Sequence, residues 1–97
     1  MVPVHETLER VECVARGRVQ GVGFRAHVRE AALSLGLAGC ARNEADGSVF
    51  IVAEGPRAAL EEFIRRIRQP RFLSRADSLD VKWSQKATSE FTGFKTL

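Results

Sequence analysis

The chain has 97 residues and a mass of 10.7 kDa, enough for one domain with a packed core but not for a second core. Because 44% of the residues are hydrophobic, disorder of the whole chain is excluded. The net charge of +3 is too small for a protein that coats duplex nucleic acid, but it suits a small anionic ligand. We therefore expect a single domain over residues 1–97.

The N-terminal residues and the two cysteines indicate in which cellular compartment the protein is expected. Residues 1–10 hold no apolar run long enough for a signal peptide, and no run of about 18 apolar residues occurs anywhere in the chain. Cys13 and Cys40 are too few for a disulfide scaffold, and neither belongs to a metal-binding pattern. We expect a cytoplasmic protein with reduced cysteines, no membrane contact and a frayed extension at residues 1–8.

The first half of the chain reads as a strand, a loop and a helix. Residues 10–16 alternate with a period of two and predict a strand, whereas residues 17–23 contain three glycines and predict a loop. A helical stripe follows, and Gly36 is placed to end that helix. The stripe consists of Phe24, Val28, Ala31, Ala32 and Leu35.

The second half predicts a hairpin, a helix and a further strand. Residues 37–43 and 48–54 flank an Asp46-Gly47 dipeptide that suits a tight turn. A helix is expected from Pro56 to about Gln69, with Glu61/Arg65 and Glu62/Arg66 as ion pairs. Alternation around Leu79, Val81 and Trp83 predicts a fourth strand, and residues 91–97 can add a short edge strand.

The predicted order is therefore βαββαβ. Two helices can cover only one face of a four-stranded sheet, which describes an α+β sandwich of the ferredoxin-like kind with a mixed or antiparallel sheet. Many unrelated activities use this architecture, so the function has to be argued from a site.

The segment that carries chemistry is residues 17–25 (GRVQGVGFR), a glycine-rich turn between a strand and the first turn of a helix. Consecutive N–H groups in such a turn can point into one concavity and bind an anion. Arg25 in the first helical turn is disfavoured by the helix dipole unless a negative charge lies nearby. On spacing alone, an anion site and a mobile loop with a solvated arginine both remain open.

These residues closely resemble the signature loop of the acylphosphatases. So do residues 36–43 (GLAGCARN) followed by 46–49 (DGSV), and the similarity extends over about residues 11–81. The resemblance implies the ferredoxin-like sandwich and hydrolysis of the carboxyl–phosphate bond of small acyl phosphates without a metal or other cofactor. It also implies that Arg25 binds phosphate and that Asn43 positions the attacking water. The main chain that cradles the phosphate is implied to be Arg18, Val19, Gln20, Gly21, Val22 and Gly23.

The chemistry expected of such a site is modest. An acyl phosphate has a good leaving group, so the protein must mainly hold the phosphoryl group and place a water in line. Arginine can bind two phosphoryl oxygens, while an asparagine amide can both accept from water and donate to the phosphate. The water's proton is expected to pass to the substrate. We expect a monomer whose partners are an acyl phosphate and inorganic phosphate or sulfate.

Other functions are compatible with parts of the sequence but agree with it less well. His27 could act as a base or metal ligand, but a lone helical histidine is more often structural. The arginines of residues 65–71 could bind nucleic acid, yet they alternate with glutamates as on a solvated helix face. An RNA-recognition module shares the βαββαβ order, but only Phe50 offers an aromatic on a central strand. A relative of the acylphosphatase-like domain of hydrogenase-maturation carbamoyltransferases is the other alternative.

Overall fold

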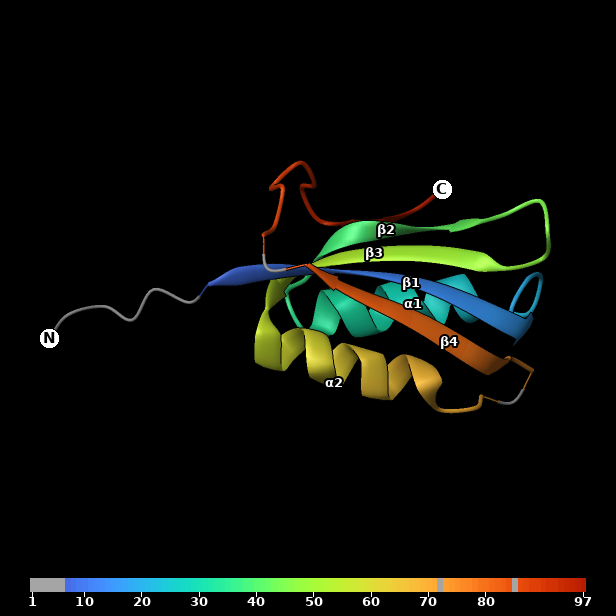
Figure 1. The fold of residues 1–97 in the computed structure, drawn as a ribbon. Helices are drawn as coiled ribbons and strands as arrows, with labels where there is room; N and C mark the ends of the chain where they lie inside the picture. Colours follow the sequence, from blue (N-terminus) through green and yellow to red (C-terminus); the bar gives the residue numbers. More distant parts are fainter. Residues whose placement is uncertain (1–6, 72, 85) are drawn as a thin grey trace, which may run out of the picture.

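The structure, a computed structural model, describes residues 7–71, 73–84 and 86–97. The first six elements follow the predicted βαββαβ order, and a short fifth strand lies within the segment expected to form one (Figure 1). The frayed extension expected at residues 1–8 falls almost entirely outside the described residues, and the first strand already begins at Leu8. The elements are β1 (Leu8–Arg18), α1 (Phe24–Ser34), β2 (Ala38–Asn43), β3 (Val49–Pro56), α2 (Arg57–Arg68), β4 (Arg75–Ser84) and β5 (Phe94–Thr96).

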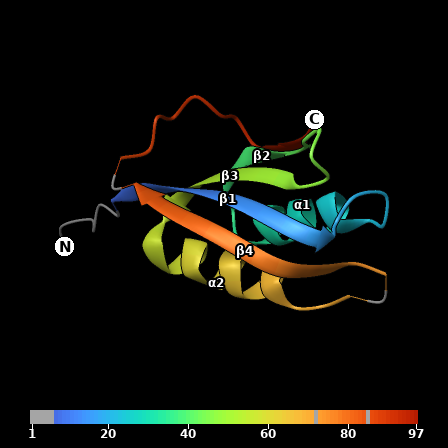
Figure 2. The ribbon, with the colours of Figure 1, turned by 45° about the vertical axis from the view of Figure 1, so that its right-hand side comes forward.

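The strands form one mixed sheet in the order β4-β1-β3-β2-β5. β1 is antiparallel to both β3 and β4, and β2 is antiparallel to β3. β5 runs parallel to β2, with Thr96 opposite Ala41. Both helices pack on the same face of the sheet (Figures 1 and 2). This arrangement confirms the ferredoxin-like fold class, and the short edge strand expected within residues 91–97 forms as β5 beside β2.

The core lies between this face of the sheet and the helices, where the predicted apolar positions meet. The inward positions of β1 (Val11, Cys13 and Ala15) are fully buried, as the period of two predicts. The α2 stripe, Leu60, Phe63, Ile64 and Ile67, is buried as well. Of the α1 stripe, Phe24, Val28, Ala31 and Ala32 are buried, whereas Leu35 is only partly buried because it lies just past the last helical turn.

Two local expectations were wrong. β1 continues to Arg18 instead of ending before Gly17, because a β-bulge between Arg16 and Gly17 lets the strand stay paired with β4. On α2, Glu62 accepts from both Arg65 (2.6 Å) and Arg66 (2.8 Å), so the expected Glu61/Arg65 pair does not form. Glu61 instead lies 3.5 Å from Arg57, one turn earlier. The corrected strand end leaves residues 19–23, called the glycine loop below, between β1 and α1.

Candidate anion-binding site

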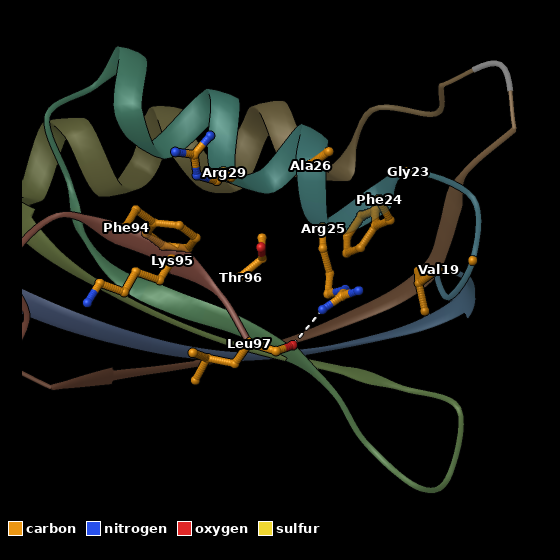
Figure 3. A pocket seen from close by; sticks show the side chains of 11 residues that line it. Val19, Gly23, Phe24, Arg25, Ala26, Arg29, Phe94, Lys95, Thr96 and Leu97 are labelled. Atoms are coloured by element: carbon orange, nitrogen blue, oxygen red, sulfur yellow. Dashed lines mark hydrogen bonds between the residues drawn. The ribbon is translucent and has the colours of Figure 1, made fainter.

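A cavity of about 680 Å³ opens where the glycine loop enters α1. One wall comes from the loop and the first turns of α1, and the other comes from β5 and the residue that follows it (Figure 3). The two walls belong to opposite ends of the sequence and meet because β5 runs beside β2 at the edge that α1 covers. The lining residues are Val19, Gly21, Gly23, Phe24, Arg25, Ala26, Arg29, Phe94, Lys95, Thr96 and Leu97.

The main chain of the glycine loop has the conformation that an anion cradle requires. Gly21 and Gly23 have φ values of 72° and 82°, in the left-handed region that glycine adopts at little cost. Within the described residues, the amides of residues 20–26 find no hydrogen-bond acceptor, while Val19 and His27 on either side donate to Gly17 and Gly23 at 3.0 Å. A run of unpaired N–H groups at a helix start, with no side-chain cap on α1, is a site for negative charge.

Arg25 points from the first turn of α1 into the same cavity. Its Nη1 donates to the main-chain oxygen of Leu97 at 2.5 Å (Figure 3). No acidic side chain pairs with Arg25 among the described residues, and the first turn of α1 contains none. Leu97 is held in turn by a hydrogen bond from its N–H to the carbonyl of Ala41 on β2 (2.9 Å). The guanidinium and the loop amides therefore meet in one cavity.

Gln20 connects the glycine loop to the β2–β3 turn, a role that the sequence analysis missed. Its side-chain amide donates to the carbonyl oxygens of Glu44 (2.8 Å) and Ser48 (2.9 Å). The family resemblance implies a role only for the main chain of Gln20. A polar side chain among glycines was a signal for a cross-link, but the partners lie 24 and 28 residues away in the sequence and could not be identified from it.

Asn43 lies close to the cavity without lining it. It is the last residue of β2, and strand alternation puts its side chain on the same sheet face as the buried Ala41, beneath α1. The next residue, Glu44, is the one that Gln20 binds. The Asn43 side chain is exposed and makes no hydrogen bond to another described residue. The Gln20–Glu44 hydrogen bond thus ties the end of β2 to the glycine loop, but Asn43 is not among the residues that line the cavity.

Arg18, which was expected to contribute to the cradle, and His27, which was expected to be structural, both lie outside this cavity. Arg18 belongs to β1, where it pairs with Arg75, and its side chain lines a separate hollow of about 460 Å³. His27 bridges the helices: its Nε2 is 3.2 Å from the carbonyl of Arg66, and its Nδ1 accepts from Arg71 at 2.9 Å. These contacts favour the structural interpretation of His27. The described part of the chain contains no group of three or more side chains suited to a metal ion.

Both cysteines are buried and free, as expected. β3 lies between the strands that carry Cys13 and Cys40, so two strand spacings, roughly 9.5 Å, separate them. Burial raises the pKa of the Cys13 thiol to about 12 and also raises the pKa of Cys40. Neither thiol faces the cavity described above.

Taken together, the fold and this cavity define a small ferredoxin-like protein with a candidate anion site at the junction of its first strand and helix. Comparison with known proteins gives the family. The acylphosphatase family model matches residues 11–96, so the chain belongs to the acylphosphatase family. An acylphosphatase of Thermus thermophilus is 45% identical over 80 residues, which are 82% of this chain and 91% of that protein.

Solved structures agree with this assignment. The crystal structure of acylphosphatase from Bacillus subtilis matches with a TM-score of 0.86 and 34% identity, covering 92% of this chain and 98% of that one. Full-length HypF in its phosphate- and nucleotide-bound form matches with a TM-score of 0.80 and 30% identity, over 93% of this chain but 12% of HypF.

Among the described residues, no helix is long and apolar enough to cross a membrane.

Proposed function

We propose that this protein is an acylphosphatase that hydrolyses the carboxyl–phosphate bond of small acyl phosphates. The observation that carries the proposal is the run of unpaired amides at residues 20–26, which share one cavity with the guanidinium of Arg25. Family membership supports the reaction, and this geometry supports the location of the phosphoryl group.

In this proposal the phosphoryl group lies between the glycine loop and Arg25. The amides and the dipole of α1 hold its oxygens from one side. The planar guanidinium of Arg25 binds from the other side, where its fork can hold two phosphoryl oxygens. Only Nη1 of Arg25 is engaged among the described residues, so the remaining N–H groups of the fork can bind phosphoryl oxygens. Together these donors neutralise charge that increases toward the transition state, without a metal ion.

Asn43 is proposed to orient the attacking water. Its carbonyl oxygen accepts a hydrogen bond from the water, and its NH₂ group donates to a phosphoryl oxygen. Gln20 fixes the turn that follows Asn43 to the glycine loop. This contact keeps the side-chain amide of Asn43 at a fixed position relative to the bound phosphate. No strong base is required because the acyl group leaves readily, and the proton of the water passes to the substrate.

We further propose a cytoplasmic monomer whose partners are an acyl phosphate and inorganic phosphate or sulfate. The free, buried cysteines are compatible with a reducing compartment. RNA is a less suitable ligand, because Phe50 on the open face of the sheet is covered by the Arg42 guanidinium at 4.8 Å from the ring centroid. A base could stack on Phe50 only after displacing Arg42.

An assay on the wild-type protein tests the proposal. Acetyl phosphate hydrolysis is measured with a chelator present and with increasing inorganic phosphate, beside an RNA titration at stated salt. We expect turnover that the chelator does not change and competitive inhibition by phosphate. Binding of RNA without hydrolysis would contradict the proposal, as would hydrolysis that the chelator abolishes.

A further inference from the structure

The cavity is longer than a phosphoryl group needs, and its far end carries a second arginine. Beyond Arg25 it continues along α1 to Arg29 and along β5 to Phe94. Figure 3 shows Arg29 one turn farther along the helix, with Thr96 between the two arginines in this view. An acyl phosphate bound through Arg25 has its acyl chain directed toward this end or into solvent.

Arg25 and Arg29 are four residues apart on α1, so their side chains leave the same side of the helix. Two like charges at this spacing repel each other. Arg29 is exposed and forms no ion pair within the described part of the chain, whereas seven other arginines, residues 10, 16, 42, 57, 65, 66 and 75, form one. The cavity therefore presents two cationic groups to whatever occupies it.

β5 determines which of its side chains can join Arg29. Phe94 is buried against Phe63, with ring centroids 6.1 Å apart, so Phe94 faces the helices. Alternation then turns Thr96 toward α1 and Lys95 away from it, and Figure 3 shows the Lys95 ammonium directed away from Arg25. Thr96 is therefore the residue of β5 whose polar side chain lies between the two arginines in Figure 3.

We propose that Arg29, assisted by Thr96, binds a carboxylate on the acyl group, so that the preferred substrates are monoacyl phosphates of dicarboxylic acids. This inference rests on the proposed function. The rise of an α-helix places Arg29 about 6 Å along the axis from Arg25, and the distal carboxylate of succinyl phosphate lies at about this distance from its phosphorus atom. A guanidinium binds a carboxylate through two parallel hydrogen bonds, and acetyl phosphate has no group that can use them.

The test compares kcat/KM for succinyl phosphate and acetyl phosphate in three proteins: the wild type, Arg29→Gln and Lys95→Gln. The control, Lys95→Gln, removes the same charge from the opposite wall of the same cavity, from a side chain that points away from Arg25. We expect Arg29→Gln to lower the succinyl-to-acetyl ratio by at least about fivefold and Lys95→Gln to change it by less than about twofold. Both residues are exposed, and melting temperatures check that the variants fold.

Three results would overturn the inference. An unchanged ratio in Arg29→Gln, with both substrates hydrolysed, removes the carboxylate site and leaves the proposed function intact. An equal loss of the ratio in both variants shows that only the general positive potential favours the substrate with the additional negative charge. Hydrolysis of neither substrate by the wild type overturns the proposed function, and the carboxylate site with it.

Discussion

Arg25 and Asn43 stand on different elements and are proposed to act on different parts of the reacting system. Arg25 faces the loop amides inside the cavity, whereas Asn43 lies at the end of β2 beside it. Substitution of Arg25 should therefore affect both phosphate binding and turnover. Substitution of Asn43 should affect turnover alone. Substitutions at the two positions separate these roles.

Replacing Arg25 by lysine keeps the charge and removes the planar fork. We expect Arg25→Lys to lose at least about 10²-fold in kcat/KM for acetyl phosphate, because an ammonium cannot hold two phosphoryl oxygens in the same geometry. Circular dichroism and melting temperature establish that the variant is folded. A folded Arg25→Lys protein with near wild-type efficiency would exclude Arg25 from the site.

Asn43→Ala removes the amide proposed to orient the water while leaving the cradle intact. Its kcat should fall by at least about 10²-fold, as for the loss of one preorganised donor, and the inhibition constant of phosphate should change little. Asn43→Gly serves as the matched variant, because asparagine can also be placed at a strand end for its backbone freedom. Normal kcat in a stable Asn43→Ala protein would refute the water-positioning role.

Gln20 contributes through its two side-chain hydrogen bonds to the β2–β3 turn. Because alanine can donate to neither carbonyl, Gln20→Ala should lower the free energy of unfolding by about 1–2 kcal/mol in urea denaturation. The control Gln69→Ala, at the exposed C-cap of α2, should change it by less than about 0.5 kcal/mol. Equal stability of the two variants would mean that the cross-link does not hold the loop.

The segment that leads to β5 is hydrogen-bonded to a single buried side chain. Glu54 of β3 is 5% exposed. It accepts from Arg10 at 3.0 Å and from the N–H groups of Thr88 (2.7 Å) and Ser89 (3.0 Å), in the segment that leads to β5. Because β5 forms one wall of the cavity, this carboxylate indirectly positions the site.

The same contacts set the pH dependence of stability. Burial alone raises the pKa of Glu54, but hydrogen bonds from Thr88, Arg10 and Ser89 outweigh it and keep the pKa below its ordinary value of 4.5. A lowered folded-state pKa means that the stabilisation is fully present above the ordinary pKa and is lost as pH falls through the lower folded-state pKa.

Glu54→Gln should therefore lower the free energy of unfolding by about 2–4 kcal/mol near pH 7. The difference in the free energy of unfolding between the wild type and Glu54→Gln should become smaller as pH is lowered to about 3.5. At that pH the stabilisation that the wild-type carboxylate provides is already being lost. Urea denaturation at both pH values measures this. Glu61→Gln, on the exposed face of α2, is the control. An equal deficit at both pH values would show that the charge of Glu54 is not what stabilises the segment.

Local patterns predicted most elements, because the periods of β1, α1 and α2 reflect which side of each faces the core. They did not predict the extension of β1, since Gly17 is read as a loop residue unless the bulge is known. They also missed the Gln20 and Glu54 networks and could not assign the parallel partner of β5, because each joins segments far apart in the sequence. The glycine loop and Arg25 could be predicted as parts of the candidate site. The second wall of the cavity, formed by β5 and Leu97, could not be predicted.

At the scale of the whole molecule, three segments converge at one end of the sandwich. The glycine loop and the β2–β3 turn lie at that end (Figure 2), and Leu97, the residue after β5, contacts Arg25 of α1 and Ala41 of β2. They are joined by the hydrogen bonds of Gln20 and Arg25 and by that of the Leu97 N–H. The rest of the chain forms the packed scaffold that holds them, which explains how a domain of this size can carry a preorganised site.

The central claim is that the glycine loop and Arg25 together bind phosphate. The most direct test is a titration of the isotopically labelled protein with inorganic phosphate, followed by amide and guanidinium NMR resonances. We predict saturable shifts centred on the amides of residues 20–26 and on the side chain of Arg25, with much weaker binding in Arg25→Gln. Saturable shifts centred elsewhere, or unchanged phosphate affinity in Arg25→Gln, would contradict this claim.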